Sequence, residues 1–132
     1  MTTRGALHHL ELWVADLAEA RASLGWLLAV LGYEEGDVWK TGSSWVHGAS
    51  YIVIEAGPDV RKVAHDRHRP GLNHLAFHAG RPEEVEALTN EAQLHGWVLM
   101  FADRHPYAGG PAHYAAYLEN RDGFEVELVA SN

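Results

Sequence analysis

The chain has 132 residues, a formal net charge of −8 and no cysteine. This length suits one compact domain, which buries roughly two-thirds of the surface exposed by its unfolded chain. The lack of cysteine excludes disulfides, thiolate metal ligands and a cysteine nucleophile. The acidic balance without a basic stripe argues against a nucleic-acid partner. Because no apolar run approaches the ~20 residues of a membrane span and residues 1–5 lack a signal-peptide pattern, we expect a cytoplasmic protein that binds no membrane.

Hydrophobic periodicity predicts a first module over residues 6–56. An alternating strand comes first, and Asp16 then caps a helix of about fifteen residues with an apolar stripe, which Gly32 ends. Three further strands complete this βαβββ module. The four predicted strands cover residues 7–14, 33–40, 44–48 and 50–55.

The same plan repeats over residues 72–130, after a linker at 57–71 that is rich in charge, histidine and proline. Its helix begins at Arg81-Pro82 and stops at Gly96. The four predicted strands cover residues 72–79, 97–102, 113–118 and 124–129. The sequence therefore predicts a single α+β domain over 1–132. Its two βαβββ modules would form an open, curved eight-stranded mixed sheet around a cleft, with the helices on the outer face.

Polar side chains recur on one face of the predicted strands, because side chains alternate across a strand. Alternation places His9, His74 and Glu127 on the faces turned away from the helices in the first, fifth and eighth strands, and places His113 and Tyr117 together in the seventh. Two imidazoles and one carboxylate suit zinc, nickel, cobalt, manganese or ferrous iron. The alternative is that these are ordinary solvent-facing residues of a half-buried sheet.

Three segments resemble a known family. The first strand reads HHLELWVADL from His8 to Leu17, the second module opens with GLNHLAFH from Gly71, and the chain closes with YLENRDGFEVEL from Tyr117. Together these segments are similar to the vicinal oxygen chelate superfamily, which includes glyoxalase I, bleomycin resistance proteins and extradiol dioxygenases. The resemblance spans residues 7–129. Many extradiol dioxygenases have two pairs of modules, whereas this chain has one.

The resemblance implies one divalent metal ion, of unknown identity, held by three residues. Carried over by position, the ligands are His9, which lies seven residues before Asp16, together with His74 and Glu127. Glu55 matches the position at which glyoxalase I carries a glutamate that acts as ligand and base. It is therefore a candidate catalytic base or fourth ligand, although it also fits a solvated glutamate at the end of a strand.

Tyr117, ten residues before Glu127, matches a tyrosine of dioxygenase and fosfomycin-type members. We predict that it takes part in catalysis as a hydrogen-bond donor to a bound oxyanion, and His113 is a weaker candidate for the same role. Of the tryptophans, Trp13, Trp45 and Trp97 fit either a pocket wall or the core. The remaining histidines of the linker, helix end and loop are predicted to be surface residues; these are His65, His68, His95 and His105.

Three functions are compatible with these residues. The leading one is a glyoxalase-like, metal-dependent isomerase or lyase, which moves a proton beside a carbonyl of a small molecule chelated through oxygen atoms. The second is a ferrous, extradiol-type ring-cleaving dioxygenase. The third is a resistance protein that binds a small molecule, such as a drug, without turnover.

An open sheet has unpaired edges that usually need cover, and members of the resembled family commonly dimerise, so we predict a homodimer. Size-exclusion chromatography with light scattering is expected to give twice the 14.6 kDa chain mass at micromolar concentration. A monomer under these conditions would refute the prediction.

Overall fold

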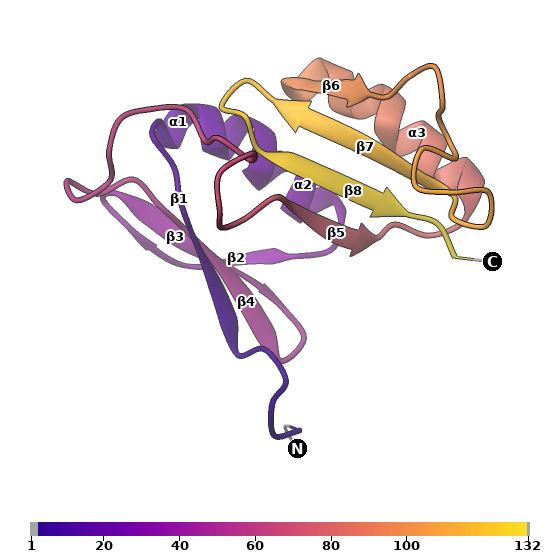
Figure 1. Cartoon of the computed structure of the whole chain (residues 1–132). Helices are drawn as coiled ribbons and strands as arrows, with labels where there is room; N and C mark the ends of the chain where they lie inside the picture. Colours follow the sequence, from indigo (N-terminus) through magenta and orange to yellow (C-terminus); the bar gives the residue numbers. More distant parts are fainter. Residues whose placement is uncertain (1–2, 132) are drawn as a thin grey trace. The chain divides into compact units, whose positions relative to one another are not determined.

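The computed structural model describes residues 3–131 and divides the chain into two compact units, Met1–Ala64 and His65–Asn132 (Figure 1). Each unit contains one open four-stranded mixed sheet with a helix packed on it. The predicted α+β class and the repeated βαβββ plan are confirmed, and the eight strands are shared equally between the two sheets. The boundary between the units, at Ala64/His65, falls inside the predicted linker. No helix within residues 3–131 is long and apolar enough to span a membrane.

In the first unit the strand order is β1-β4-β3-β2, and β1 runs parallel to β4. The helical stretch begins after Asp16, whose side chain accepts a hydrogen bond from the Glu19 backbone N–H at 3.1 Å, as predicted for a cap. It ends before Gly32, whose φ of +98° favours glycine. The strands are β1 (His9–Trp13), β2 (Glu34–Trp39), β3 (Gly42–His47) and β4 (Ser50–Glu55).

The first helix is not a uniform α-helix. It consists of α1 (Leu17–Ala20), a π-helical turn η1 (Arg21–Gly25) and α2 (Trp26–Val30). Gly25 lies against the indole of Trp45, and a Cβ at this position would stand 3.3 Å from the ring. Trp45 is buried between the helix and the sheet, so it belongs to the core.

In the second unit the strand order is β5-β8-β7-β6, and β5 runs parallel to β8. Figure 1 shows α3 (Pro82–Ala92) lying along β6 and β7, and a 3-10 turn η2 (Gln93–His95) follows it. Fully buried Leu118, Val126 and Leu128 form much of the core. Burial of each stabilises the fold by about 1.5–3 kcal/mol. The strands are β5 (His74–His78), β6 (Trp97–Met100), β7 (Ala115–Asn120) and β8 (Glu125–Val129).

Residues 65–73, which comprise the end of the predicted linker (57–71) and the two residues before β5, pack against the β7–β8 turn of the second unit. The ring of His65 stacks on Phe124 with centroids 4.5 Å apart, and its backbone N–H donates to the Asp122 carbonyl at 2.8 Å. Gly123 makes this approach possible, because a Cβ there would overlap the His65 carbonyl oxygen. The prediction of His65 as a surface residue was therefore wrong, since ring stacking half-buries it.

The loop between β6 and β7 is fastened to α3 by Glu86. His105 Nε2 donates to Glu86 Oε1 at 2.8 Å, and the Tyr114 hydroxyl donates to Oε2 at 2.7 Å. Hydrogen bonding to Glu86 raises the pKa of Tyr114 to about 12. The side chain of His105 is only 14% exposed, so its prediction as a surface residue was also wrong. The predicted seventh strand begins two residues later than expected, which leaves His113 in this fastened loop.

Gly123→Ala tests the docking of residues 65–73. Gly123 has φ +84° as well as the close His65 carbonyl, so alanine adds backbone strain and steric overlap. We expect a loss of about 2–4 kcal/mol in the free energy of unfolding, measured with urea. The control is Gly48→Ala, which has φ +60° and open space around the Cβ, and should cost only about 1 kcal/mol. Equal losses would contradict the docking.

Glu86→Gln tests the loop fastening through pH. Burial raises the pKa of Glu86, but the hydrogen bonds from Tyr114 and His105 outweigh it, so the net pKa is lowered. A lowered folded pKa contributes stability that is present above the unfolded value and lost as pH falls through the folded one. The stability advantage of wild type over Glu86→Gln should therefore be present at about pH 6 and shrink below about pH 4. Glu91→Gln, exposed on the same helix, should show no such trend.

Candidate metal centre

Strand β8, one of the two inner strands of the second unit, carries a carboxylate that faces two histidines. In the register, Glu127 on β8 pairs with Ala76 on β5 and with Tyr117 on β7. Residues paired in register, and those two apart along a strand, share a face. His74, Tyr117 and Glu127 therefore lie on one face of the sheet, as alternation in the sequence predicts.

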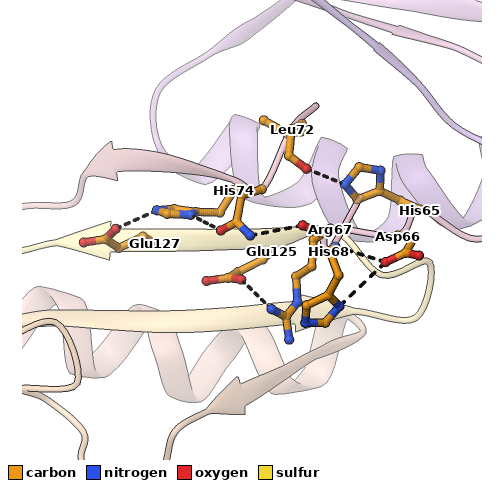
Figure 2. Close-up of polar contacts among 9 residues, drawn as sticks. His65, Asp66, Arg67, His68, Leu72, His74, Glu125 and Glu127 are labelled. Carbon is orange, nitrogen blue, oxygen red and sulfur yellow. Dashed lines mark hydrogen bonds and ion pairs between the residues drawn. The ribbon is translucent and has the colours of Figure 1, made fainter. Parts of the chain in front are cut away.

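Glu127 is 6% exposed, and a carboxylate this buried needs partners. His74 Nε2 lies 3.1 Å from its Oε1, and Figure 2 shows the His74 ring directed at Glu127. His113 Nε2–H donates a hydrogen bond to its Oε2. Burial, and then the negative charge of Glu127, raise the pKa of Tyr117, so its hydroxyl stays protonated and able to donate. Gly109 covers this group, because a Cβ there would collide with the Tyr117 hydroxyl.

His74 and Glu127 fit two ligands of one divalent cation. Zn²⁺ binds imidazole nitrogen and carboxylate oxygen at about 2.0–2.2 Å, which sets neighbouring donor atoms about 3.3–3.5 Å apart at the tetrahedral angle and about 2.8–3.0 Å apart at the octahedral angle. The observed separation of 3.1 Å lies between these two ranges and is also the length of an ordinary hydrogen bond. Within residues 3–131, no group of three or more His, Asp or Glu side chains fits a metal ion. The pair alone is therefore fewer than the three protein ligands of a typical catalytic zinc site.

His9 lies on β1 in the first unit. Its ring stacks on Tyr51 with centroids 4.8 Å apart, and its Nδ1 is 3.0 Å from His8 Nδ1. It is exposed, on the same face as Glu11 and Trp13, whereas Leu12 on the opposite face is buried. The alternation predicted for this strand is therefore present, and His9 is accessible to a ligand.

Glu55 is not equivalent in register to Glu127. The residue two places after His74 pairs with Glu127, whereas the residue two places after His9 pairs with Val53. Glu55 pairs with Trp13, two residue pairs further along the strands. Sequence alone showed only that both strands contain a glutamate. The offset becomes visible once the pairing between the strands is known.

The carboxylate of Glu55 is held by neighbours in its own unit. It accepts a hydrogen bond from Trp39 Nε1 at 2.9 Å. A hydrogen bond from the Thr41 side chain, opposed by burial and reinforced by Trp39, lowers the pKa of Glu55. Glu55 therefore stays ionised at neutral pH, and its orientation is fixed.

A hollow of about 460 Å³ opens on the face of the first sheet that carries His9 and Glu55. Its lining is mainly apolar and aromatic, with Asp37 as its charged residue, and includes Trp39, Val46, Tyr51 and Val53. A β-bulge between Glu35 and Val38 shapes its rim. Tyr51, which stacks on His9, connects the hollow to the candidate ligand.

The structure thus brings His74, Glu127, His113 and Tyr117 together and places His9 and Glu55 in the other unit. Sequence reasoning missed Asn73, whose side chain contacts His74. Its position directly before a candidate ligand was the available signal. Trp97 is buried in the core, whereas Trp13 is half exposed on the polar face of β1.

Comparisons with known proteins agree with this fold. The chain is 43% identical over 125 residues to the uncharacterized protein YqjT of Bacillus subtilis (strain 168), covering 94% of this chain and 98% of YqjT. It is also 43% identical to a candidate glyoxalase from Bacillus halodurans of known crystal structure, with a TM-score of 0.90 and 97% of each chain covered. The fosfomycin resistance protein FosX of Listeria monocytogenes, solved with Mn(II) and sulfate, shares the fold at 20% identity, with a TM-score of 0.67 over 98% of this chain and 95% of FosX.

Residues 8–117 match the sequence profile of one family, and this match covers most of both units. The resemblance seen in the strand motifs is therefore confirmed. The chain belongs to the Glyoxalase/Bleomycin resistance protein/Dioxygenase superfamily.

Proposed function

We propose that the protein is a glyoxalase-type, metal-dependent isomerase or lyase that acts on a small molecule bound to a divalent cation through oxygen atoms. The observation that carries this proposal is the His74–Glu127 pair, with a buried carboxylate oxygen 3.1 Å from an imidazole nitrogen. Donors at this spacing suit zinc, nickel, cobalt, manganese or iron. The Mn(II) in FosX supports a divalent cation in a protein of this fold.

The proposed protein ligands are His9, His74 and Glu127. Three protein ligands leave coordination positions for the substrate, as in catalytic rather than structural metal sites. When bound, the cation supplies Lewis-acid stabilisation of negative charge on substrate oxygens. His113 holds the second oxygen of Glu127, which leaves Oε1 directed at His74.

The other residues bind substrate and move a proton. Glu55, an ionised carboxylate of fixed orientation, is the proposed base, and it is alternatively a fourth ligand. The hydrogen bonds that lower its pKa make it a weaker base, and substrate binding would have to displace them. Tyr117, kept protonated, is proposed to donate a hydrogen bond to a substrate oxyanion. The hollow lined by Val46, Tyr51 and Val53 suits the apolar part of a substrate.

A ferrous, ring-cleaving dioxygenase is the second candidate. It is favoured by one observation. Tyr117 on β7 is paired with Glu127 on the neighbouring strand β8, and both side chains lie on the same face of the sheet. Such a site combines a carboxylate ligand and two histidines with a hydrogen-bond donor for bound substrate oxygen. The identity of the bound metal separates the two candidates.

Metal content tests the proposal. Untagged wild type, purified without chelator and also after reloading, is expected to hold about one divalent cation per chain by elemental mass spectrometry. His9→Ala, His74→Ala and Glu127→Gln should each lower the affinity by at least about tenfold, because each removes a ligand. His68→Ala is the matched control, since this side chain is 74% exposed and pairs only with the neighbouring Asp66 in the described contacts.

The outcomes separate the three functions. Zinc, nickel, cobalt or manganese lost in the ligand variants supports the isomerase or lyase, and iron lost in the same way favours the dioxygenase. Wild type without metal, even after reloading, would overturn the proposal and leave a small-molecule binding protein. Retention of full affinity in His9→Ala would remove His9 from the ligand set.

A further inference from the structure

The side chain of Asn73 bridges the docked segment and His74. Its Nδ2–H donates to the Arg67 carbonyl at 3.1 Å, and its Oδ1 lies 2.7 Å from His74 Nδ1. An amide side chain can be placed in two orientations that differ by a flip. The flipped orientation would set two carbonyl oxygens against each other at Arg67. The contact with Arg67 therefore fixes which end of Asn73 meets His74.

This orientation determines the tautomer of His74. An amide oxygen only accepts hydrogen bonds, so His74 Nδ1 must carry the hydrogen. In a neutral imidazole, the lone pair is then on Nε2, the atom 3.1 Å from Glu127 Oε1. Two lone pairs facing each other at this distance repel, unless a cation or a proton lies between them. Metal-binding histidines commonly donate their other ring N–H to an oxygen in this way.

The anchor of Asn73 is itself held in place. The Arg67 guanidinium lies 3.5 Å from the buried carboxylate of Glu125, and His65 Nε2–H donates to the Leu72 carbonyl at 3.0 Å. Figure 2 shows these contacts surrounding the start of β5, with the His74 ring directed at Glu127. The Arg67 carbonyl is therefore a fixed acceptor next to His74.

We propose that Asn73 is a positioning residue, which locks His74 in the Nδ1–H tautomer so that the Nε2 lone pair faces Glu127 and the incoming cation. The inference rests on the proposed metal-dependent function. Residues 65–73 would then orient His74 before the metal binds, because the Arg67 carbonyl and the Asn73 side-chain amide both belong to this segment.

The first test reads the tautomer directly. Long-range ¹H–¹⁵N NMR of the metal-free protein should show His74 with hydrogen on Nδ1. Asn73→Ala should shift the population towards Nε2–H, because the acceptor is lost. Asn73→Asp loses the donation to the Arg67 carbonyl but keeps an acceptor oxygen for Nδ1, so it should retain the wild-type tautomer. Asn90→Ala, an exposed asparagine on α3, is the matched control.

The second test reads the affinity for Co²⁺ by calorimetric titration. Loss of an outer-shell partner typically weakens metal affinity by about 10–100-fold, which is the loss expected for Asn73→Ala. Asn73→Asp should recover part of this loss, because it still accepts from Nδ1 but no longer donates to the Arg67 carbonyl. Thermal unfolding of each variant identifies any general loss of fold, and the Asn73→Asp rescue excludes such a loss as the cause.

The inference and the proposed function can fail separately. If wild type binds Co²⁺ while Asn73→Ala keeps both affinity and tautomer, Asn73 has no positioning role and the metal function stands. If wild type binds no Co²⁺, the metal function is overturned, and the role of Asn73 towards a cation is overturned with it. A tautomer change together with a lower affinity in Asn73→Ala, with the wild-type tautomer kept and the affinity partly restored in Asn73→Asp, supports both.

Discussion

A nearly buried carboxylate in the middle of a sheet governs the second unit. Glu127 lies on β8 between β5 and β7, where a charged group is costly unless other groups compensate it. Its two oxygens meet different histidines, one from the start of β5 and one from the loop before β7. A hydrophobic residue would fill this position at lower cost, and the proposed cation would give the carboxylate a function.

Several features of the second unit serve to hold these histidines. Gly123 admits the backbone of His65, whose stacking on Phe124 fixes the segment that ends at Asn73 and His74. On the other side of the sheet, Glu86 fastens Tyr114, and with it the loop that contains His113. The Asp122-Gly123 turn therefore closes the β7–β8 hairpin and also contacts the backbone of His65, in the segment that leads to His74.

Most of the fold was predictable because periodicity and capping act locally. Asp16 and Gly32 bound the first helix as predicted, and the alternation in β1 and β8 gave the correct faces for His9 and Glu127. The relation of Glu55 to Glu127 was not predictable, because register depends on pairing between distant strands. The contacts of Asn73 with Arg67 and His74 were missed for another reason. The alternation of side chains predicts which face of a strand a residue occupies, but not which groups a side chain just before the strand contacts.

The central claim is that a divalent cation lies between His74 and Glu127. An anomalous difference map from crystals of the wild-type protein grown with Co²⁺ tests it most directly. The account predicts a peak within about 2.0–2.2 Å of both His74 Nε2 and Glu127 Oε1. No peak there, or peaks only at exposed histidines such as His68, would contradict it.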